Sequence, residues 1–366
     1  GVQTCALPIS LDKLVASARA ARLEARGTVA LAEPGAFEAS GRLSRFDPRA
    51  FVATAPPADL NTRFSIQGQR APQLKGALDF DLAPSTLEGK PLEGGGRLVV
   101  DGRRLADVRL ALALAGNRVS AKGRYGKPGD ALDIAVDAPA LAALGHGLGG
   151  RLRLSGVLRG SPDHPAGEFD LGAEQLSVGG LRVDAVNGRG RVAEGRSGPI
   201  ALTVGLAGLR QSGPAGSGNG NGDALVRRAS LVFDGTRAAN TARLDIQARG
   251  DNALQVALAG ALGDGPRWQG RLESLQVRGD YPIALLAPAT LLLSRDSVQL
   301  GTAELRGPSG GRYRLDETRW DARHLVARGS VSGVQVGVML DPSTRKVQSR
   351  GDSLQVGGEW NVNIGE

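Results

Sequence analysis

ARLDIQARGDNALQVALAG, residues 242–260, contains the pattern that decides the fold. Apolar side chains alternate with charged or amide ones, stop at Gly-Asp-Asn, and then resume the same alternation. Successive side chains of an extended chain point to opposite faces, so this stretch predicts two strands that share one apolar face and are joined by a turn. The apolar positions are Leu244, Ile246, Leu254, Val256 and Leu258.

The same alternation recurs along the chain, from about residue 26 to residue 366, with a turn signal roughly every dozen residues. We interpret its apolar positions as the lining of one continuous apolar face. With the five positions above, the candidate lining residues are Leu78, Phe80, Leu98, Val100, Leu110, Leu112, Leu114, Leu132, Ile134, Val136, Leu152, Leu154, Leu202, Val204, Leu206, Leu291, Leu293, Val334, Val336, Val338, Trp360, Val362 and Ile364.

Short clusters of Gly, Pro, Asp and Asn, which favour turns, separate these runs at 126–130, 263–265 and 307–311. Composition indicates a thin layer, because the chain contains 54 Gly but only three Trp, three Tyr and seven Phe. The sequence therefore predicts an all-β protein, an elongated and curled antiparallel sheet with an apolar interior and few or no long helices. Two segments, 10–27 and 138–145, are instead compatible with short helices.

The charge pattern argues against a nucleic-acid partner. The formal net charge is +8, and most of the cations are arginines that stand singly beside apolar residues. The densest pairs, Arg103-Arg104 and Arg227-Arg228, are isolated. Nucleic-acid grooves combine basic clusters with aromatic side chains. We therefore expect the arginines to form the solvated face of the strands.

Motifs for chemistry are sparse. The single cysteine, Cys5, permits no internal disulfide, and no Cys/His set suits a metal, so we expect no cofactor. GHGLGG at 145–150 has dinucleotide-binding spacing but precedes a strand-like run rather than a helix. GPSGG around Ser309 joins two strand-like runs and predicts a hairpin turn rather than a nucleophile. We expect no enzyme, although scattered carboxylates leave a polysaccharide-active enzyme as an alternative.

An apolar face of this length requires a cover in water. One possibility is a closed sandwich with a dry core, as in a structural or adhesive β-repeat protein. The other is a curled sheet whose trough holds acyl chains. The residues alone leave both possibilities open.

Several glycine-containing phrases carry a family resemblance. They are S-x-L-x-G-x-P-L-x-G at Ser85, Leu87, Gly89, Pro91, Leu92 and Gly94, G-N-x-V-x-A-x-G at Gly116, Asn117, Val119, Ala121 and Gly123, and L-x-G-x-L-x-G at Leu154, Gly156, Leu158 and Gly160. A later stretch, RWQGRLESLQVRGDYPIALLAPATLLLS, matches a segment with Trp, Gly, Leu and Ala-Pro before a strand. Together and in this order, the phrases resemble the TamB family of proteobacteria, the AsmA-like translocation and assembly module.

The resemblance implies a fold and a function. It implies a sheet folded into a trough, a repeating β-groove or β-taco, in a protein that spans the periplasm from an inner-membrane anchor. It implies transport of phospholipid between the inner and outer membranes, aid to outer-membrane protein assembly, or both. The implied partners are phospholipid acyl chains and a TamA-like outer-membrane protein. No catalytic residues carry over from the family.

The ends of the sequence suggest a fragment. GVQTCALPI, residues 1–9, resembles a translated sequencing adapter, so we expect these residues to be foreign to the natural protein. We expect residues 10–366 to be part of one elongated β-groove, and GPAGSGNGNG at 213–222 to be a low-complexity loop. On this interpretation, the membrane anchor and the parts that meet TamA belong to the natural protein outside this fragment.

Overall fold

A computed structural model describes residues 9–18, 20–50, 52–195, 197–211, 224–263, 266–340 and 347–365. For residues 309, 335–340 and 347–354, only the backbone is described. The N-terminal residues 1–8 and the low-complexity segment 213–222 lie outside the described residues.

The described residues form twenty-four β-strands and three short 3-10 helices. The chain divides into two units, Gly1–Glu194 and Gly195–Glu366, and each is described by itself below. The prediction of an all-β protein without long helices is confirmed.

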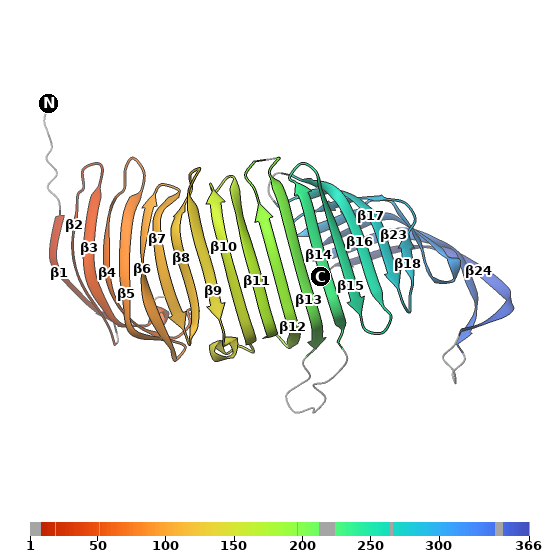
Figure 1. Ribbon diagram of the computed structural model, residues 1–366, viewed down its shortest axis with the longest axis horizontal. Helices are drawn as coiled ribbons and strands as arrows, with labels where there is room; N and C mark the ends of the chain where they lie inside the picture. The colour runs from red at the N-terminus through yellow and green to blue at the C-terminus, as the bar shows by residue number, and fades with distance from the viewer. Residues whose placement is uncertain are drawn as a thin grey trace. The chain divides into compact units, whose positions relative to one another are not determined.

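Unit 1 is a meander in which each strand pairs antiparallel with the next, from β1 to β12. Figure 1 shows these strands side by side in chain order. The elements are β1 (Ile9–Ala18), β2 (Ala21–Val29), β3 (Ala36–Phe46), η1 (Pro48–Ala50), β4 (Ala58–Gln69), β5 (Lys75–Leu87), β6 (Lys90–Asp101), β7 (Arg104–Leu114), β8 (Asn117–Tyr125), β9 (Ala131–Ala138), η2 (Leu141–Leu144), β10 (Gly149–Gly160), β11 (Pro165–Val178) and β12 (Leu181–Val192).

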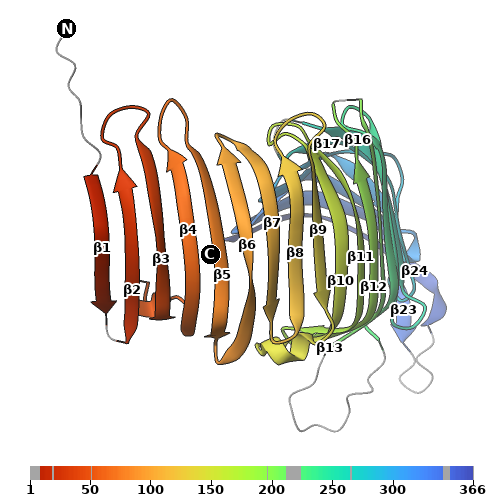
Figure 2. The same ribbon diagram turned by 60° about the vertical axis from the view of Figure 1, so that its left-hand side comes forward.

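Unit 2 continues the antiparallel pattern with one interruption. Two broken strands, β18 with β19 and β20 with β21, lie between β17 and β22. Both views show the sheet of this unit curling (Figures 1 and 2). The elements are β13 (Pro199–Gln211), β14 (Val226–Thr236), β15 (Asn240–Ala248), β16 (Ala253–Leu262), β17 (Trp268–Arg278), β18 (Ile283–Leu285), β19 (Ala289–Leu293), β20 (Ser297–Leu300), β21 (Ala303–Arg306), η3 (Pro308–Gly310), β22 (Arg312–Asp321), β23 (His324–Leu340) and β24 (Val347–Gly365).

The helix expected over 10–27 is wrong. This segment forms β1 and β2, which pair with each other, and β2 also pairs with β3. Its alanines and charged residues have good helix propensity, but pairing in the sheet satisfies the same backbone groups and overrides that preference. The segment 138–145 contains only η2, a single 3-10 turn whose Leu141 is buried. Across the described ranges, no helix is long and apolar enough to span a membrane.

Two of the three predicted turns lie among the described residues, and both connect strands. Residues 126–130 connect β8 with β9, and 307–311 connect β21 with β22 through η3. The third, 263–265, lies partly outside the described residues.

Buried asparagines hold strand ends together. Asn240 donates from Nδ2 to the carbonyl of Thr236 at 2.9 Å, and its Oδ1 accepts the indole N–H of Trp268 at 2.7 Å. Asn117 brackets Ala140, since it accepts that residue's N–H and donates to its carbonyl, each at 3.1 Å. A buried polar group is costly unless it is paired, so these side chains specify where the strands begin and end.

A buried carboxylate ties two hairpin turns of unit 1 together. Asp130, whose side chain is 4% exposed, accepts two hydrogen bonds from the Arg104 guanidinium, both at 2.8 Å. Its Oδ2 also accepts the backbone N–H of Lys127 at 3.1 Å. Hydrogen bonding to Arg104 holds the pKa of Asp130 below its ordinary value.

Asn240→Ala should destabilise unit 2 by about 2 kcal/mol, because the Trp268 indole and the Thr236 carbonyl both lose a buried partner. All three tryptophans of the chain, at 268, 320 and 360, lie in unit 2, so tryptophan emission during urea unfolding reports this unit alone. The exposed Asn361 supplies the control, and Asn361→Ala should leave the midpoint unchanged. Equal midpoints for both variants would contradict the role of Asn240.

Asp130→Asn should lower the melting temperature at neutral pH. The folded-state pKa of Asp130 is depressed, so the ionised form stabilises the fold above the unfolded pKa of about 3.9. That contribution disappears as the pH falls through the folded-state pKa, and the difference between wild type and variant should shrink accordingly. Thermal melts followed by circular dichroism from neutral to acidic pH measure this difference.

Asp163→Asn is the matched control for that series. Asp163 pairs with Arg103 at 3.0 Å, but both side chains are largely exposed. Exposed pairs contribute little, so this variant should melt like the wild type at every pH. A constant Asp130→Asn difference across the whole pH range would contradict the linkage.

Candidate functional site

Strand register in unit 2 aligns apolar side chains into rows. Residues directly opposite each other on antiparallel strands point to the same face. One row crosses five strands, β13 to β17, through successive partners Val204, Leu231, Leu244, Val256 and Leu275. The apolar positions of residues 242–260, which form β15 and β16, are therefore continued by apolar partners in β14 and β17.

Unit 1 contains equivalent rows. Successive partners across β4–β7 are Ile66, Leu78, Leu98 and Val108, and across β8–β11 they are Val119, Val136, Leu154 and Leu171. We call the side of each sheet that carries these rows the apolar face.

The register places the predicted lining residues consistently. In unit 1, all of them, from Leu78 to Leu154, lie on the apolar face. In unit 2, those from Leu202 to Val334 and from Trp360 to Ile364 also share one face. The side chains of Val336 and Val338 lie outside the described residues. Contact of these residues with acyl chains stays a prediction.

The search for strict alternation along each strand did not identify members of the apolar face that lie beside a bulge. Leu272 and Leu275 of β17 are three residues apart, yet their partners Leu258 and Val256 lie on one face. A bulge in β17 between these partners adds one residue and restores the face. A strict alternation search fails across such a bulge, so the pattern of a single strand could not find Leu272.

The opposite face is polar and carries cross-strand ion pairs. Arg97 lies 2.7 Å from Asp79, and Arg189 lies 2.7 Å from Asp170. Arg153, which neighbours Leu154 in sequence but is 84% exposed, pairs with Asp137 at 3.5 Å. These exposed pairs add little stability. They keep this face hydrated, as expected for the solvated arginines.

The apolar faces are only partly buried. Among the larger apolar side chains of the described residues, Val108 and Leu132 are the most buried, at 6% exposed, whereas Val119 of the same face is 42% exposed. Most of the rows therefore pack sideways against neighbouring strands, without the complete enclosure of a core.

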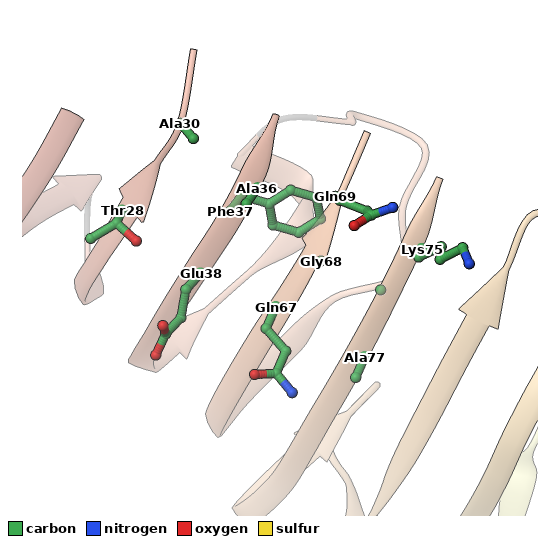
Figure 3. Close-up of a pocket in the computed structure, with 11 residues that line it drawn as sticks. Thr28, Ala30, Ala36, Phe37, Glu38, Gln67, Gly68, Gln69, Lys75 and Ala77 are labelled. Carbon is green, nitrogen blue, oxygen red and sulfur yellow. The ribbon is translucent and has the colours of Figure 1, made fainter. Parts of the chain in front are cut away.

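Aromatic rings on the apolar face lie over glycines of adjacent strands. Phe169 has Gly156 and Gly190 as its two register partners. A Cβ at Gly190 would fall well inside van der Waals contact with the Phe169 ring. A Cβ at Gly68 would lie 2.7 Å from Cζ of Phe37, and Figure 3 shows that ring reaching from β3 across to β4.

The contact of a ring with a neighbouring glycine makes the apolar face smoother. A glycine leaves a hollow in the row, and the neighbouring ring lies in that hollow instead of standing out from the sheet. Trp268 does the same in unit 2, where its ring covers both Gly260 and Gly270. The large side chains of the apolar face therefore do not form isolated projections at these positions.

The motifs considered for chemistry do not form a site among the described residues. In the part of the chain that the structure describes, no group of three or more His, Cys, Asp and Glu side chains could hold a metal ion. GHGLGG follows η2 and its last two residues begin β10, the reverse of the strand-to-helix order that a dinucleotide site needs. His146 lies in that segment and its Nε2 is 2.7 Å from Glu88, while His324 is 3.4 Å from Asp321.

Gly190→Val should destabilise unit 1 by about 1–3 kcal/mol, because the new side chain displaces the Phe169 ring. Phe169→Ala in the same chain should recover much of that loss, since the clash is then absent. The matched control is Gly172→Ala on β11, where a Cβ meets nothing within 4 Å. Melting temperatures by circular dichroism complete the double-mutant cycle, and additive losses would contradict the ring-over-glycine contact.

Comparison with protein-family models matches residues 7–292 to TamB, N-terminal domain. Searches of curated proteins and of solved structures found no match. The matched range is well over half of the 366 residues and includes strands of both units. It also contains the three glycine-containing phrases on which the sequence resemblance was based, and all but the last two residues of the later stretch at 267–294. The chain belongs to the TamB family.

Proposed function

We propose that the apolar faces bind phospholipid acyl chains and conduct phospholipid across the periplasm between the inner and outer membranes, with a connected role in outer-membrane protein assembly. The cargo contacts the candidate lining residues, such as Leu154 in unit 1 and Val256 in unit 2. The headgroup stays in water. No catalytic step is involved.

The observation that supports this proposal best is that the rows of apolar side chains are continuous across strands but remain partly exposed. Apolar partners follow one another across strand after strand in both units. Members of these rows such as Val119 and Phe169 nevertheless remain 42% and 36% exposed. A dry, closed core would require these side chains to be enclosed. A surface that completes its burial with a ligand leaves them in this state.

The energetics favour acyl chains. An acyl chain of about fifteen methylenes gains roughly 12 kcal/mol on leaving water. The lining consists mainly of Leu, Val, Ile and Ala, and rings lie over glycines, so no deep pocket holds one position much more tightly than the next. Similar affinity at successive strands allows a lipid to move along the rows without a large barrier.

Family membership supports the same assignment. The TamB family functions in translocation and assembly or in lipid transport in the cell envelope, and it is a non-enzymatic, periplasmic family associated with TamA. Binding of this chain to a TamA-like partner and an inner-membrane anchor for the natural protein are parts of the proposal.

Photo-crosslinking tests the proposal directly. A photoreactive amino acid at Leu154 or Val256 should capture phospholipid in cells, and mass spectrometry of the product should identify the lipid. The neighbouring polar-face positions Arg153 and Gln255 are matched controls, because each lies one residue away on the same strand and faces the opposite side. Capture at both parities, or at neither, would rule out lipid binding by the apolar face, and the second result would favour a dry structural protein.

A further inference from the structure

A row of apolar and aromatic side chains crosses unit 2 along one set of strand ends. Successive register partners Trp268, Leu293, Val298, Trp320, Leu325 and Ile364 cross six strands in an unbroken line. Each lies in the first or last two residues of its strand. We call this line the Trp rim, since it contains two of the three tryptophans.

The rim is exposed along its later part. Trp268 is covered and only 8% exposed, but Trp320 is 50% exposed and Ile364 is 61% exposed. Trp320 lies at the end of β22, beside the turn to β23. A large, half-exposed indole at a strand end is not needed to fill the sheet, and it is available to an external partner.

Arginines lie in the turns directly beyond the rim. Arg267 precedes β17, Arg295 lies between β19 and β20, and Arg323 lies between β22 and β23. All three are exposed, and within the described residues none of them makes an ion pair. Among the described residues of these turns, the carboxylates are the exposed Asp296 and the partly buried Asp321. Asp264, in the segment before Arg267, lies outside the described residues.

Asp321 is already used within its own turn. Its Oδ1 accepts the backbone N–H groups of Arg323 at 3.1 Å and His324 at 2.9 Å. These hydrogen bonds hold the pKa of Asp321 below its ordinary value. Oδ1 of Asp321 is therefore bonded to the backbone, and among the described residues the Arg323 guanidinium makes no ion pair, so it is available to an external acceptor.

From this arrangement we infer that the Trp rim and its arginine turns dock on the surface of an anionic phospholipid membrane. Tryptophan prefers the boundary between hydrocarbon and headgroups, where its ring is apolar and its N–H stays near water. Arginine pairs with lipid phosphates through its planar fork of donors. The rim places the half-exposed Trp320 and Ile364 at strand ends, and the three exposed arginines lie in the turns just beyond these ends.

The rim is the strand-end margin of the apolar face, and two of its members, Leu293 and Ile364, are also candidate lining residues. It differs from the middle of the apolar face in chemistry, because Trp320 and the arginines of the adjoining turns lie only at these strand ends. Docking on a membrane therefore does not depend on transport by the apolar face. Crosslinking at Leu154 and Val256 tests the cargo surface, and vesicle binding tests the rim, so either one can fail without the other.

Flotation of the full chain with vesicles tests the inference. Vesicles of phosphatidylethanolamine with phosphatidylglycerol should carry the protein upward, and vesicles of phosphatidylcholine should bind it more weakly. The triple variant Arg267→Gln, Arg295→Gln, Arg323→Gln should bind the anionic vesicles about a hundredfold more weakly, at about fivefold per arginine. Trp320→Ser should weaken binding to both kinds of vesicle by about tenfold.

Two control variants separate the rim from the rest of unit 2. Tyr281→Ser removes an aromatic side chain that is 74% exposed at the opposite strand ends, between β17 and β18. Arg243→Gln removes an exposed arginine from the polar face of β15. Both should bind vesicles like the wild type. Losses equal to those of the rim variants, or rim variants that bind normally, would overturn the inference.

A fluorophore provides a second readout that needs no rim variant. With Cys5 replaced by serine, an environment-sensitive dye is attached at Ala322→Cys in the turn beyond the rim, or at Asp251→Cys in the β15–β16 turn at the opposite strand ends. The phosphatidylglycerol vesicles should shift the emission at position 322 to shorter wavelength and leave position 251 unchanged. A shift at 251 alone, or at neither position, would contradict docking through the rim.

Discussion

Strand register is the constraint on which the rest of the structure depends. The side-chain period of a strand is two, so a slip of one residue at any strand would move its apolar side chains to the polar face. The row from Val204 to Leu275 exists only because four successive pairings keep the same parity. Both apolar burial and the cross-strand ion pairs of the other face enforce that parity, since a slipped strand would oppose leucines to arginines on both sides of the sheet.

The bulge of β17 and the buried, hydrogen-bonded asparagines let the sheet bend while its apolar side chains stay on one face. The bulge of β17 inserts a residue between Leu275 and Leu272 and returns the chain to the same face. Asn240 and Asn117 then close strand ends with hydrogen bonds that only a correctly registered neighbour can supply. These polar side chains lie at the first residues of their strands, Asn117 in β8 and Asn240 in β15, away from the middle of the apolar face.

The sequence predicted the strands well, because alternation is a local signal. It failed for 10–27, where local composition favours a helix and only pairing with β3 decides for strands. It also failed wherever the deciding contact joins residues on different strands. The contact of Phe169 with Gly190 cannot be inferred from either residue, and the Trp rim requires the register of six strands. The division into two units has no counterpart in the alternation, which continues through it.

Partial burial of the apolar side chains explains how a single sheet can be stable and still bind an apolar ligand. Each apolar side chain loses part of its exposure to its row partners and to neighbours two residues along its own strand, which stabilises the sheet without a second layer. The area that remains exposed still carries a free energy of about 25 cal/mol per Å² towards any apolar ligand. A covering layer of protein would gain that energy once and permanently, whereas a mobile acyl chain gains it at each strand in turn. In the proposed function, the exposure of Val119 and Phe169 supplies the affinity for a cargo that must also be able to leave.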